Sequence, residues 1–293
     1  MPQKVTAPQI LARKGGPKIK MVTAYDAPSA LIADRAGADI ILVGDSVTNV
    51  VLGYDSTLAA TIDVMVHHTA AVARANPKAL VLGDMPWLSY HASAEETVNN
   101  AGRLVRAGGA GAVKLEGGRK RIPAVRAVLD AEIPVMGHLG LTPQSVHAMG
   151  GYKVQGRQAH AAYELISDAH GLADAGVFGL VLEGVPDVVA SVITEEVQVP
   201  TIGIGAGAHC DGQVLVFHDV LGLGGEWTPK FVRRYANLAD DAVAALERFF
   251  ADVDSGVFPS EDETYHMPEE SAEILRGFTQ ASDSLLADEA MEN

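Results

Sequence analysis

The stretch ALVLGD, residues 79–84, is a short apolar run that ends on a carboxylate. An apolar run of this length, closed by a glycine and a polar residue, is typical of a strand buried on both faces of a parallel sheet. The pattern recurs along the chain, and we expect strands at 19–23, 39–43, 79–83, 111–115, 133–137, 178–182, 199–204 and 213–217.

Amphipathic segments of helical period separate most of these runs. Three of them, each with the glycine that follows it, are 27–36 with Gly37, 94–107 with Gly108 and 161–175 with Gly176. A glycine at this position commonly ends a helix. Strands that alternate with helices form parallel sheets. Eight such units in about 200 residues favour a (β/α)8 TIM barrel over an open doubly wound sheet.

The end of the chain differs from the rest in charge. Residues 251–293 hold 12 acidic residues and one basic residue, Arg276. We expect a single barrel domain over residues 1–251, which ends in a further helix at 230–251. We expect an acidic C-terminal extension over 252–293, with short helical patches and a mostly solvated chain.

Composition limits the classes of partner and the compartment. With 48% hydrophobic residues in 293, the chain can bury a large core. A net charge of −15 argues against nucleic acid and against a membrane surface as partners. The single cysteine, Cys210, excludes an internal disulfide and is expected to be buried. Because no apolar run approaches about 18 residues and no apolar signal core follows the start, we expect a cytoplasmic protein.

Five of the expected strands are closed by an ionisable side chain. The five are Asp45, Asp84, Glu116, His138 and Glu183. A lone carboxylate after a strand is more often a helix cap or a turn former, but five at equivalent places indicate a site at the mouth of the barrel. Three carboxylates at close range either raise one another's pKa or surround a cation. Oxygen ligands favour Mg²⁺ or Mn²⁺ over structural Zn²⁺.

Three of the residues suggest roles at this mouth. Lys114 lies two residues before Glu116, so both side chains face the same side of a strand. Lys114 either neutralises Glu116 or binds a substrate carboxylate or enolate oxygen. His138 is either a core histidine or a donor that orients a ligand. Glu183 lies farther round the ring, where it is placed to act as a general base.

Several long stretches resemble the ketopantoate hydroxymethyltransferase family. They are MVTAYDAPSA (21–30), ILVGDSVTNVVLGYDSTLAAT (41–61), VLGDMPWLSY (81–90), AGGAGAVKLEGG (107–118), IPVMGHLGLTPQSVHAMGGYKVQGR (133–157), LVLEGVP (180–186), TIGIGAGAHCDGQVLVFHDVLGL (201–223) and TPKFVRRY (228–235). The resemblance implies transfer of a hydroxymethyl group from 5,10-methylenetetrahydrofolate to 3-methyl-2-oxobutanoate, giving 2-dehydropantoate and tetrahydrofolate. This is the first step of pantothenate, and so coenzyme A, biosynthesis.

The resemblance also implies partners and an assembly. It implies one Mg²⁺ per subunit, with other divalent metals as alternatives. The partners would be a small-molecule 2-oxo acid and a reduced folate. The assembly would be a homo-oligomer, which is a decamer in bacterial relatives.

Carried over position by position, the resemblance assigns roles to individual residues. Its metal ligands fall on Asp45 in VGDS, Asp84 in GDMP and Glu116 in KLEGG. Its substrate-binding residues fall on Asp45, Ser46, Asp84 and Lys114, and Ser46 is indicated by the resemblance alone apart from its place beside Asp45. Its proton acceptor falls on Glu183 in LVLEG, with His138 in support. The implied mechanism is Mg²⁺-assisted enolisation by the Glu183 base, after which the enolate attacks the one-carbon unit.

Two other functions are compatible with these features. A mutase or lyase related to isocitrate lyase uses a similar acidic mouth on 2-oxo acids, but Cys210 lies in no nucleophile motif such as a lyase needs. A non-catalytic binding or assembly barrel is the other alternative, and the ring of strand-end acids argues against it. The glycines of residues 201–213 permit either phosphate binding or close turns around an elongated ligand.

Overall fold

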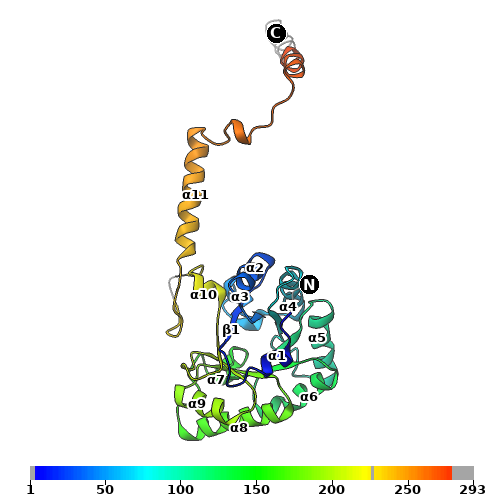
Figure 1. Cartoon of the computed structure of the whole chain (residues 1–293), viewed down its shortest axis with the longest axis vertical. Helices are drawn as coiled ribbons and strands as arrows, with labels where there is room; N and C mark the ends of the chain where they lie inside the picture. The colour runs from blue at the N-terminus through cyan, green and yellow to red at the C-terminus, as the bar shows by residue number, and fades with distance from the viewer. Residues whose placement is uncertain (1–3, 226–227, 279–293) are drawn as a thin grey trace, which may run out of the picture. The chain divides into compact units, whose positions relative to one another are not determined.

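Eight parallel strands close into a barrel in the computed structural model of the chain, which describes residues 4–225 and 228–278 (Figure 1). The strands are β1 (Ile19–Thr23), β2 (Ile40–Val43), β3 (Leu80–Asp84), β4 (Ala112–Glu116), β5 (Val135–Gly140), β6 (Gly179–Glu183), β7 (Thr201–Ile204) and β8 (Gly212–Leu215). Each strand pairs with the next one along the chain, and β8 closes the ring on β1, where Gly212 is opposite Ile19. The predicted (β/α)8 TIM barrel is confirmed, and no strand end differs from its expected position by more than three residues.

Helices surround the strands (Figure 1). The longer ones on the barrel are α2 (Ala27–Arg35), α4 (Ile62–Arg74), α5 (Ala94–Arg106), α6 (Ile122–Asp130), α8 (Ala159–Ala175) and α9 (Asp187–Glu196). The shorter ones are α1 (Ala7–Leu11), α3 (Val47–Val50), α7 (Val146–Met149) and α10 (Phe217–Leu221). Within the described residues, no helix is both long and apolar enough to cross a membrane.

Two of the three predicted stop glycines have the left-handed backbone that ends a helix. Gly37 follows α2 with φ of 85°, and Gly176 follows α8 with φ of 104°. After α5 the left-handed residue is Gly109 and not Gly108. Gly108 is needed for another reason, because a Cβ there would lie 2.4 Å from the Leu104 carbonyl oxygen.

The apolar core has two layers. Side chains such as Ile40, Leu82 and Met136 fill the barrel interior, and Ile10 of α1 packs with them. A second layer, which includes Leu115, Leu172 and Val189, lies between the strands and the helices. Burial of each large aliphatic side chain contributes about 1.5–3 kcal/mol, so these layers hold the fold without help from the polar mouth.

The segment after α10 differs from the expectation. A helix was expected at 230–251, but α11 spans Leu238–Ser255. The residues before it fold back on α10, since the Tyr235 N–H donates to the Val220 carbonyl oxygen over 2.8 Å. Pro229 starts a turn in which its carbonyl accepts from the Val232 N–H over 2.9 Å.

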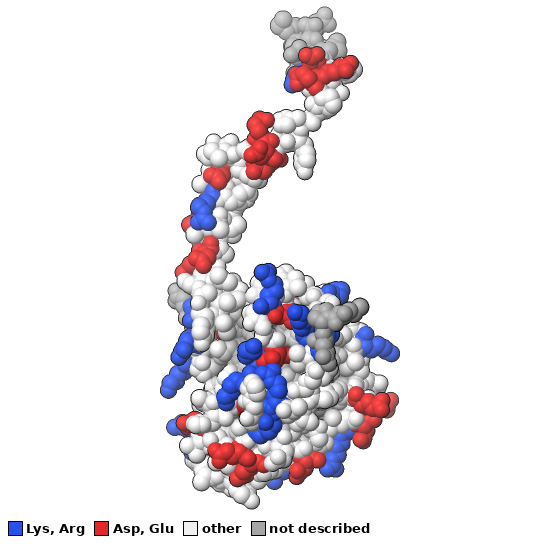
Figure 2. All heavy atoms as spheres, in the orientation of Figure 1, with Lys and Arg blue, Asp and Glu red and all other residues white. Residues whose placement is uncertain are grey.

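The chain forms two compact units, Met1–Leu238 and Ala239–Asn293. The expected domain boundary at residue 251 lies inside α11, which belongs to the second unit apart from its first residue. In this unit residues 269–278 are helical, and every side chain at 256–278 except Ala272 is exposed. Figure 2 shows acidic side chains along this unit, while Lys and Arg side chains gather on the visible face of the barrel.

Candidate active site

The register of the sheet brings the expected site residues to one side of the barrel wall. Asp84 is opposite Lys114, Glu116 is opposite His138, and Gly140 is opposite Glu183. Residues opposite each other in a parallel sheet point to the same face, and so do residues two apart on one strand. The five polar side chains of this ladder therefore all point into the mouth.

Gly140 allows β5 and β6 to meet at the mouth. The sequence suggested that β5 ends before His138, but the strand continues to Gly140 and pairs there with Glu183. Gly140 has φ of 94°, and a Cβ on it would lie 2.1 Å from the Glu183 carbonyl oxygen. Only glycine fits this position, and the close approach lets His138 reach the Glu183 carboxylate.

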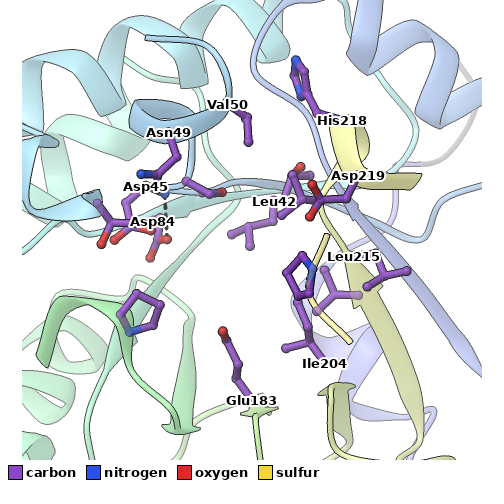
Figure 3. A pocket seen from close by; sticks show the side chains of 18 of the residues that line it. Leu42, Asp45, Asn49, Val50, Asp84, Glu183, Ile204, Leu215, His218 and Asp219 are labelled. Atoms are coloured by element: carbon purple, nitrogen blue, oxygen red, sulfur yellow. Dashed lines mark hydrogen bonds between the residues drawn. The ribbon is translucent and has the colours of Figure 1, made fainter. Parts of the chain in front are cut away.

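One cavity of about 700 Å³ collects all the site residues expected from the sequence (Figure 3). Its lining includes Asp45, Ser46, Asp84, Lys114, Glu116, His138 and Glu183. Asp45 follows β2 directly after Gly44, and Asp84, Glu116 and Glu183 are the last residues of their strands. The strand-end reasoning therefore identified one wall of a single cavity.

Asp45, Asp84 and Lys114 form its most buried part. The Asp45 N–H donates to Asp84 Oδ2 over 3.1 Å, which brings the two carboxylates together. Lys114 Nζ lies 2.9 Å from Asp84 Oδ1. Burial alone would lower the pKa of Lys114, but Asp84, Glu116 and Asp45 raise it, so Lys114 is a cation at neutral pH.

Glu116, His138 and Glu183 form a chain across the mouth. Glu116 Oε1 lies 3.1 Å from His138 Nδ1, and Glu183 Oε2 lies 3.2 Å from His138 Nε2. Burial and Lys114, whose Nζ is 3.3 Å from Nδ1, oppose protonation of the ring, but the two carboxylates raise the pKa of His138 to about 9. In the protein without a bound metal, the ring is therefore a cation at neutral pH that links the two glutamates.

The two aspartates carry an electrostatic cost that a cation would relieve. Burial raises the pKa of Asp45 well above its usual value, and the charges of Asp84 and Glu116 raise it further. Burial likewise raises the pKa of Asp84, although Lys114 opposes this shift. Two close carboxylates that have raised pKa values and offer only oxygen atoms as ligands suit a hard divalent ion such as Mg²⁺.

The three-carboxylate ligand set is not preassembled. Among residues 4–225 and 228–278, no group of three or more His, Cys, Asp or Glu side chains is arranged to hold a metal ion. Instead, Lys114 contacts Asp84 and lies 3.9 Å from Glu116 Oε1, while the Gln144 amide contacts Asp45. Asp45 and Asp84 still fit Mg²⁺, because that ion commonly uses one or two carboxylates and takes its other ligands from water and substrate.

Sequence reasoning missed two buried residues that connect the carboxylates. Gln144 Nε2 donates to Asp45 Oδ2 over 2.9 Å, and the Gln144 N–H donates to Glu116 Oε2 over 3.0 Å. The Tyr90 hydroxyl donates to Gln144 Oε1 over 2.5 Å and accepts from the Glu116 N–H over 3.2 Å. Both come from loops, where no hydrophobic period marks a residue that points inward.

Ser46 has a partner that the sequence did not indicate. Its hydroxyl lies 2.8 Å from the hydroxyl of Tyr25, which is 1% exposed. Burial raises the pKa of Tyr25, so its hydroxyl stays neutral and the pair keeps a proton to donate. The Ser46 hydroxyl is thus held at the edge of the cavity by a fixed neighbour.

The cavity extends well beyond the acidic cluster. Its other end is formed by β7, β8 and the segment that follows, and includes Ile204, Leu215, His218, Asp219 and Phe231. Figure 3 shows Asp219 and Asp45 on different sides of the cavity, with Glu183 directed into the space between. The site can therefore hold a small anion at one end and a second, larger molecule at the other.

A closed parallel barrel with a buried acidic and lysine cluster at the carboxyl ends of its strands defines a (β/α)8-barrel enzyme. The family model described as "Ketopantoate hydroxymethyltransferase" matches residues 4–261. The chain belongs to this family, and it is a transferase.

Named relatives match over nearly their full length. The chain is 58% identical to the 3-methyl-2-oxobutanoate hydroxymethyltransferase of Moorella thermoacetica, over 89% of this chain and 98% of that protein. It is 55% identical to the protein of the same name from Syntrophomonas wolfei, over 90% of this chain and 95% of that protein. The resemblance stated from the motifs is confirmed, and the non-catalytic alternative is set aside.

Solved structures of other enzymes share the fold. A phosphoenolpyruvate phosphomutase from Streptomyces platensis matches with a TM-score of 0.57 at 16% identity, over 95% of this chain and 98% of that one. A 2,3-dimethylmalate lyase matches with a TM-score of 0.55 at 16% identity, over 97% of this chain and 99% of that one. These likenesses concern the barrel alone, while the family match separates the chain from the mutase and lyase alternative.

Proposed function

We propose that this enzyme transfers a hydroxymethyl group from 5,10-methylenetetrahydrofolate to 3-methyl-2-oxobutanoate, which gives 2-dehydropantoate and tetrahydrofolate. The observation that carries the proposal is a base, Glu183, that faces the Asp84–Lys114 pair in one cavity of a family member. Such a cavity can hold a keto acid and remove its C3 proton. In metabolism the reaction would open the route to pantothenate.

The keto acid would bind at the acidic and lysine end. Lys114 offers an ammonium group to the carboxylate of the keto acid, or to the keto oxygen that becomes negative as the enolate forms. Ser46 would contact the same substrate through its hydroxyl and backbone, with Tyr25 behind it at 2.8 Å. Both partners are fixed before the substrate arrives, so little ordering entropy is lost on binding.

We propose that Asp45, Asp84 and Glu116 would hold one Mg²⁺ or a similar divalent ion. When bound, the ion supplies electrophilic stabilisation of the keto oxygen, which makes the neighbouring C–H acidic enough for a carboxylate to remove. The buried acidic oxygens suit such an ion, and the carboxylates would also help to orient the substrate.

Glu183 would act as the base. The Glu183 residue is half-buried, and its Oε2 lies 3.2 Å from Nε2 of the His138 ring. His138 is itself held by Glu116, so it fixes the direction of Glu183 toward the cavity. In this arrangement the Glu183 carboxylate would accept the C3 proton while the His138 ring keeps its orientation.

The atoms of the reaction balance as follows. The C3–H bond breaks and its proton passes to Glu183, and a C3–CH2 bond forms to the one-carbon unit. Water supplies the hydroxyl of the product. The two bonds between the methylene carbon and the folate nitrogens break, and these nitrogens take up the water proton and the proton that Glu183 releases, which regenerates the base.

A product assay tests the proposal. The full chain is incubated with Mg²⁺, 3-methyl-2-oxobutanoate and 5,10-methylenetetrahydrofolate that carries ¹³C in its methylene group, and products are identified by mass spectrometry. We expect 2-dehydropantoate with one added ¹³C, formed only when all three components are present.

A matched substrate provides the control. 3,3-Dimethyl-2-oxobutanoate has the same keto-acid head but no C3 hydrogen, so it should bind and inhibit without reacting. Formation of cleavage products from the keto acid, or failure of the complete mixture to give labelled 2-dehydropantoate, would contradict the proposed function.

A further inference from the structure

The far end of the cavity is too large and too apolar to serve the keto acid alone. A five-carbon keto acid needs only the acidic and lysine end of a cavity of about 700 Å³. The remaining wall includes Ile204, Leu215, His218, Asp219, Leu223 and Phe231, here called the β8 wall, and Arg234 lines the same cavity. Apolar side chains with one carboxylate form a slot for a flat ring with hydrogen-bond donors on one edge.

Asp219 is the acidic group of the β8 wall. It lies in the first turn of α10, and its side chain is half-buried. No residue in the described part of the chain donates a hydrogen bond to its carboxylate or lies within ion-pair distance of it. Burial raises its pKa, although Arg234 opposes the shift. A half-buried carboxylate without a partner gains most from a ligand that supplies donors.

His218 adds a second unpartnered group at the same end. Its Nδ1 is buried and has no hydrogen-bond partner among the described residues. Its ring packs against Tyr25, with ring centroids 5.6 Å apart, so the imidazole is held in place. Because this nitrogen is buried against the protein, His218 contributes a fixed ring edge to the wall, and Asp219 is the group of this pair that can bind a ligand.

We propose that Asp219 binds the pterin ring of the reduced folate. This inference rests on the proposed function and assigns its second substrate to a definite place. The pterin carries N3–H and the 2-amino group side by side, which is the same fork of donors that arginine presents to a carboxylate. The apolar side chains of the β8 wall would pack against the faces of the ring.

The position of Asp219 suits the transfer. Figure 3 shows the Asp219 and Glu183 side chains both directed into the cavity, with Asp45 and Asp84 on a different side. A keto acid at the acidic end and a pterin at Asp219 would face each other across this space.

The test uses Asp219→Asn, which keeps the shape of the side chain and removes the charge and one acceptor. Two measurements separate the two ends of the cavity. Tetrahydrofolate binding is measured by titration calorimetry, and exchange of the C3 hydrogen of 3-methyl-2-oxobutanoate is measured by NMR in D2O with Mg²⁺ and no folate. We expect tetrahydrofolate affinity to fall about 10- to 100-fold while C3 exchange stays within about twofold of the original rate.

An analogue identifies the atoms involved. A 2-desamino tetrahydrofolate lacks one of the two proposed donors, so it should bind the original enzyme and Asp219→Asn with nearly equal affinity. Asp55→Asn is the matched control, because Asp55 is an exposed carboxylate on another loop that lines the same cavity. It should leave tetrahydrofolate affinity unchanged.

The outcomes are distinct. Unchanged tetrahydrofolate affinity in Asp219→Asn, or an equal loss of C3 exchange, would overturn the assignment of Asp219. Preserved C3 exchange also shows that the variant is folded. Failure of the original enzyme itself to exchange C3 hydrogen and to bind tetrahydrofolate would instead contradict the proposed function.

Discussion

The side-chain amide of Gln144 donates a hydrogen bond to Asp45 Oδ2 over 2.9 Å, and both residues are buried. The orientation of this amide is set by its other end, because Gln144 Oε1 accepts from the Tyr90 hydroxyl. Burial and the charge of Glu116 raise the pKa of Tyr90, so its hydroxyl keeps the proton that it donates. Gln144 thus holds one proposed metal ligand by its side chain and another, Glu116, by its backbone.

Replacement of Gln144 by leucine should weaken metal binding without unfolding the barrel. Loss of a hydrogen bond that orients a metal ligand typically costs about 10- to 100-fold in metal affinity. We expect that loss for Gln144→Leu, and a smaller one for Tyr90→Phe, which frees the amide to turn and leaves the Glu116 N–H without its acceptor. Mn²⁺ titration followed by electron paramagnetic resonance measures the affinity directly.

Gln158→Leu is the control for this prediction. Gln158 is exposed and makes no side-chain cap bond at the start of α8. Equal Mn²⁺ affinity in Gln144→Leu and Gln158→Leu would show that the amide does not position the ligand.

Metal affinity should rise with pH through the titration of the aspartates. In the metal-free protein, Asp45 and Asp84 have raised pKa values, so protons compete with the metal at a higher pH than for exposed carboxylates. A carboxyl with a raised folded-state pKa stabilises the fold below its unfolded pKa and loses that contribution as pH rises through the folded value. Asp45→Asn should therefore stabilise the metal-free protein at pH 7, by about 1–2 kcal/mol.

Thermal unfolding with and without Mg²⁺ checks this pair of effects. Mg²⁺ should raise the melting temperature of the original enzyme and leave that of Asp45→Asn nearly unchanged. An Asp45→Asn variant that is less stable than the metal-free original at pH 7 would contradict the electrostatic argument.

Asp211 should stabilise the opposite, amino end of the barrel. Its carboxylate is 6% exposed, accepts from the Thr201 and Gly15 N–H groups over 2.9 and 3.0 Å, and lies 2.9 Å from Lys14 Nζ. Burial alone would raise the pKa of Asp211, but these partners lower it. The stabilisation is therefore present above the ordinary carboxyl pKa and is lost as pH falls through the lowered folded value.

Asp211→Asn should cost about 1–3 kcal/mol of unfolding free energy at pH 7. The difference in unfolding free energy between Asp211→Asn and the original protein should shrink as pH falls below about 4. Asp63→Asn is the control, because Asp63 pairs with Arg103 on the surface, where its side chain is 78% exposed. Chemical denaturation at several pH values measures both variants, and equal losses for the two would show that burial of Asp211 is irrelevant.

Much of the fold was predictable because the strands are apolar runs that end on polar residues. The same rule found Asp84, Glu116 and Glu183, which are the last residues of β3, β4 and β6. The rule does not reach Asp219, which lies four residues after the end of β8 at Leu215 and inside α10.

The rest of the site depends on contacts that no local pattern encodes. Gln144 lies in a single turn at Pro143–Ser145, and only the closed barrel brings it to Asp45, 99 positions earlier in the chain. Local sequence also does not show how the carboxylates pair. Lys114 contacts Asp84 and Gln144 contacts Asp45, and these contacts form only in the folded barrel. Sequence spacing gave the members of the cluster but not how they pair.

The most direct test of the account is the exchange of the C3 hydrogen of 3-methyl-2-oxobutanoate in Glu183→Gln. The variant keeps the size of the side chain and removes the basic oxygen, so Mg²⁺ and keto-acid binding should persist. NMR in D2O should show rapid Mg²⁺-dependent exchange for the original enzyme and at least about a 100-fold slower exchange for the variant. Undiminished exchange in Glu183→Gln, with normal keto-acid affinity, would contradict the assignment of Glu183 as the base.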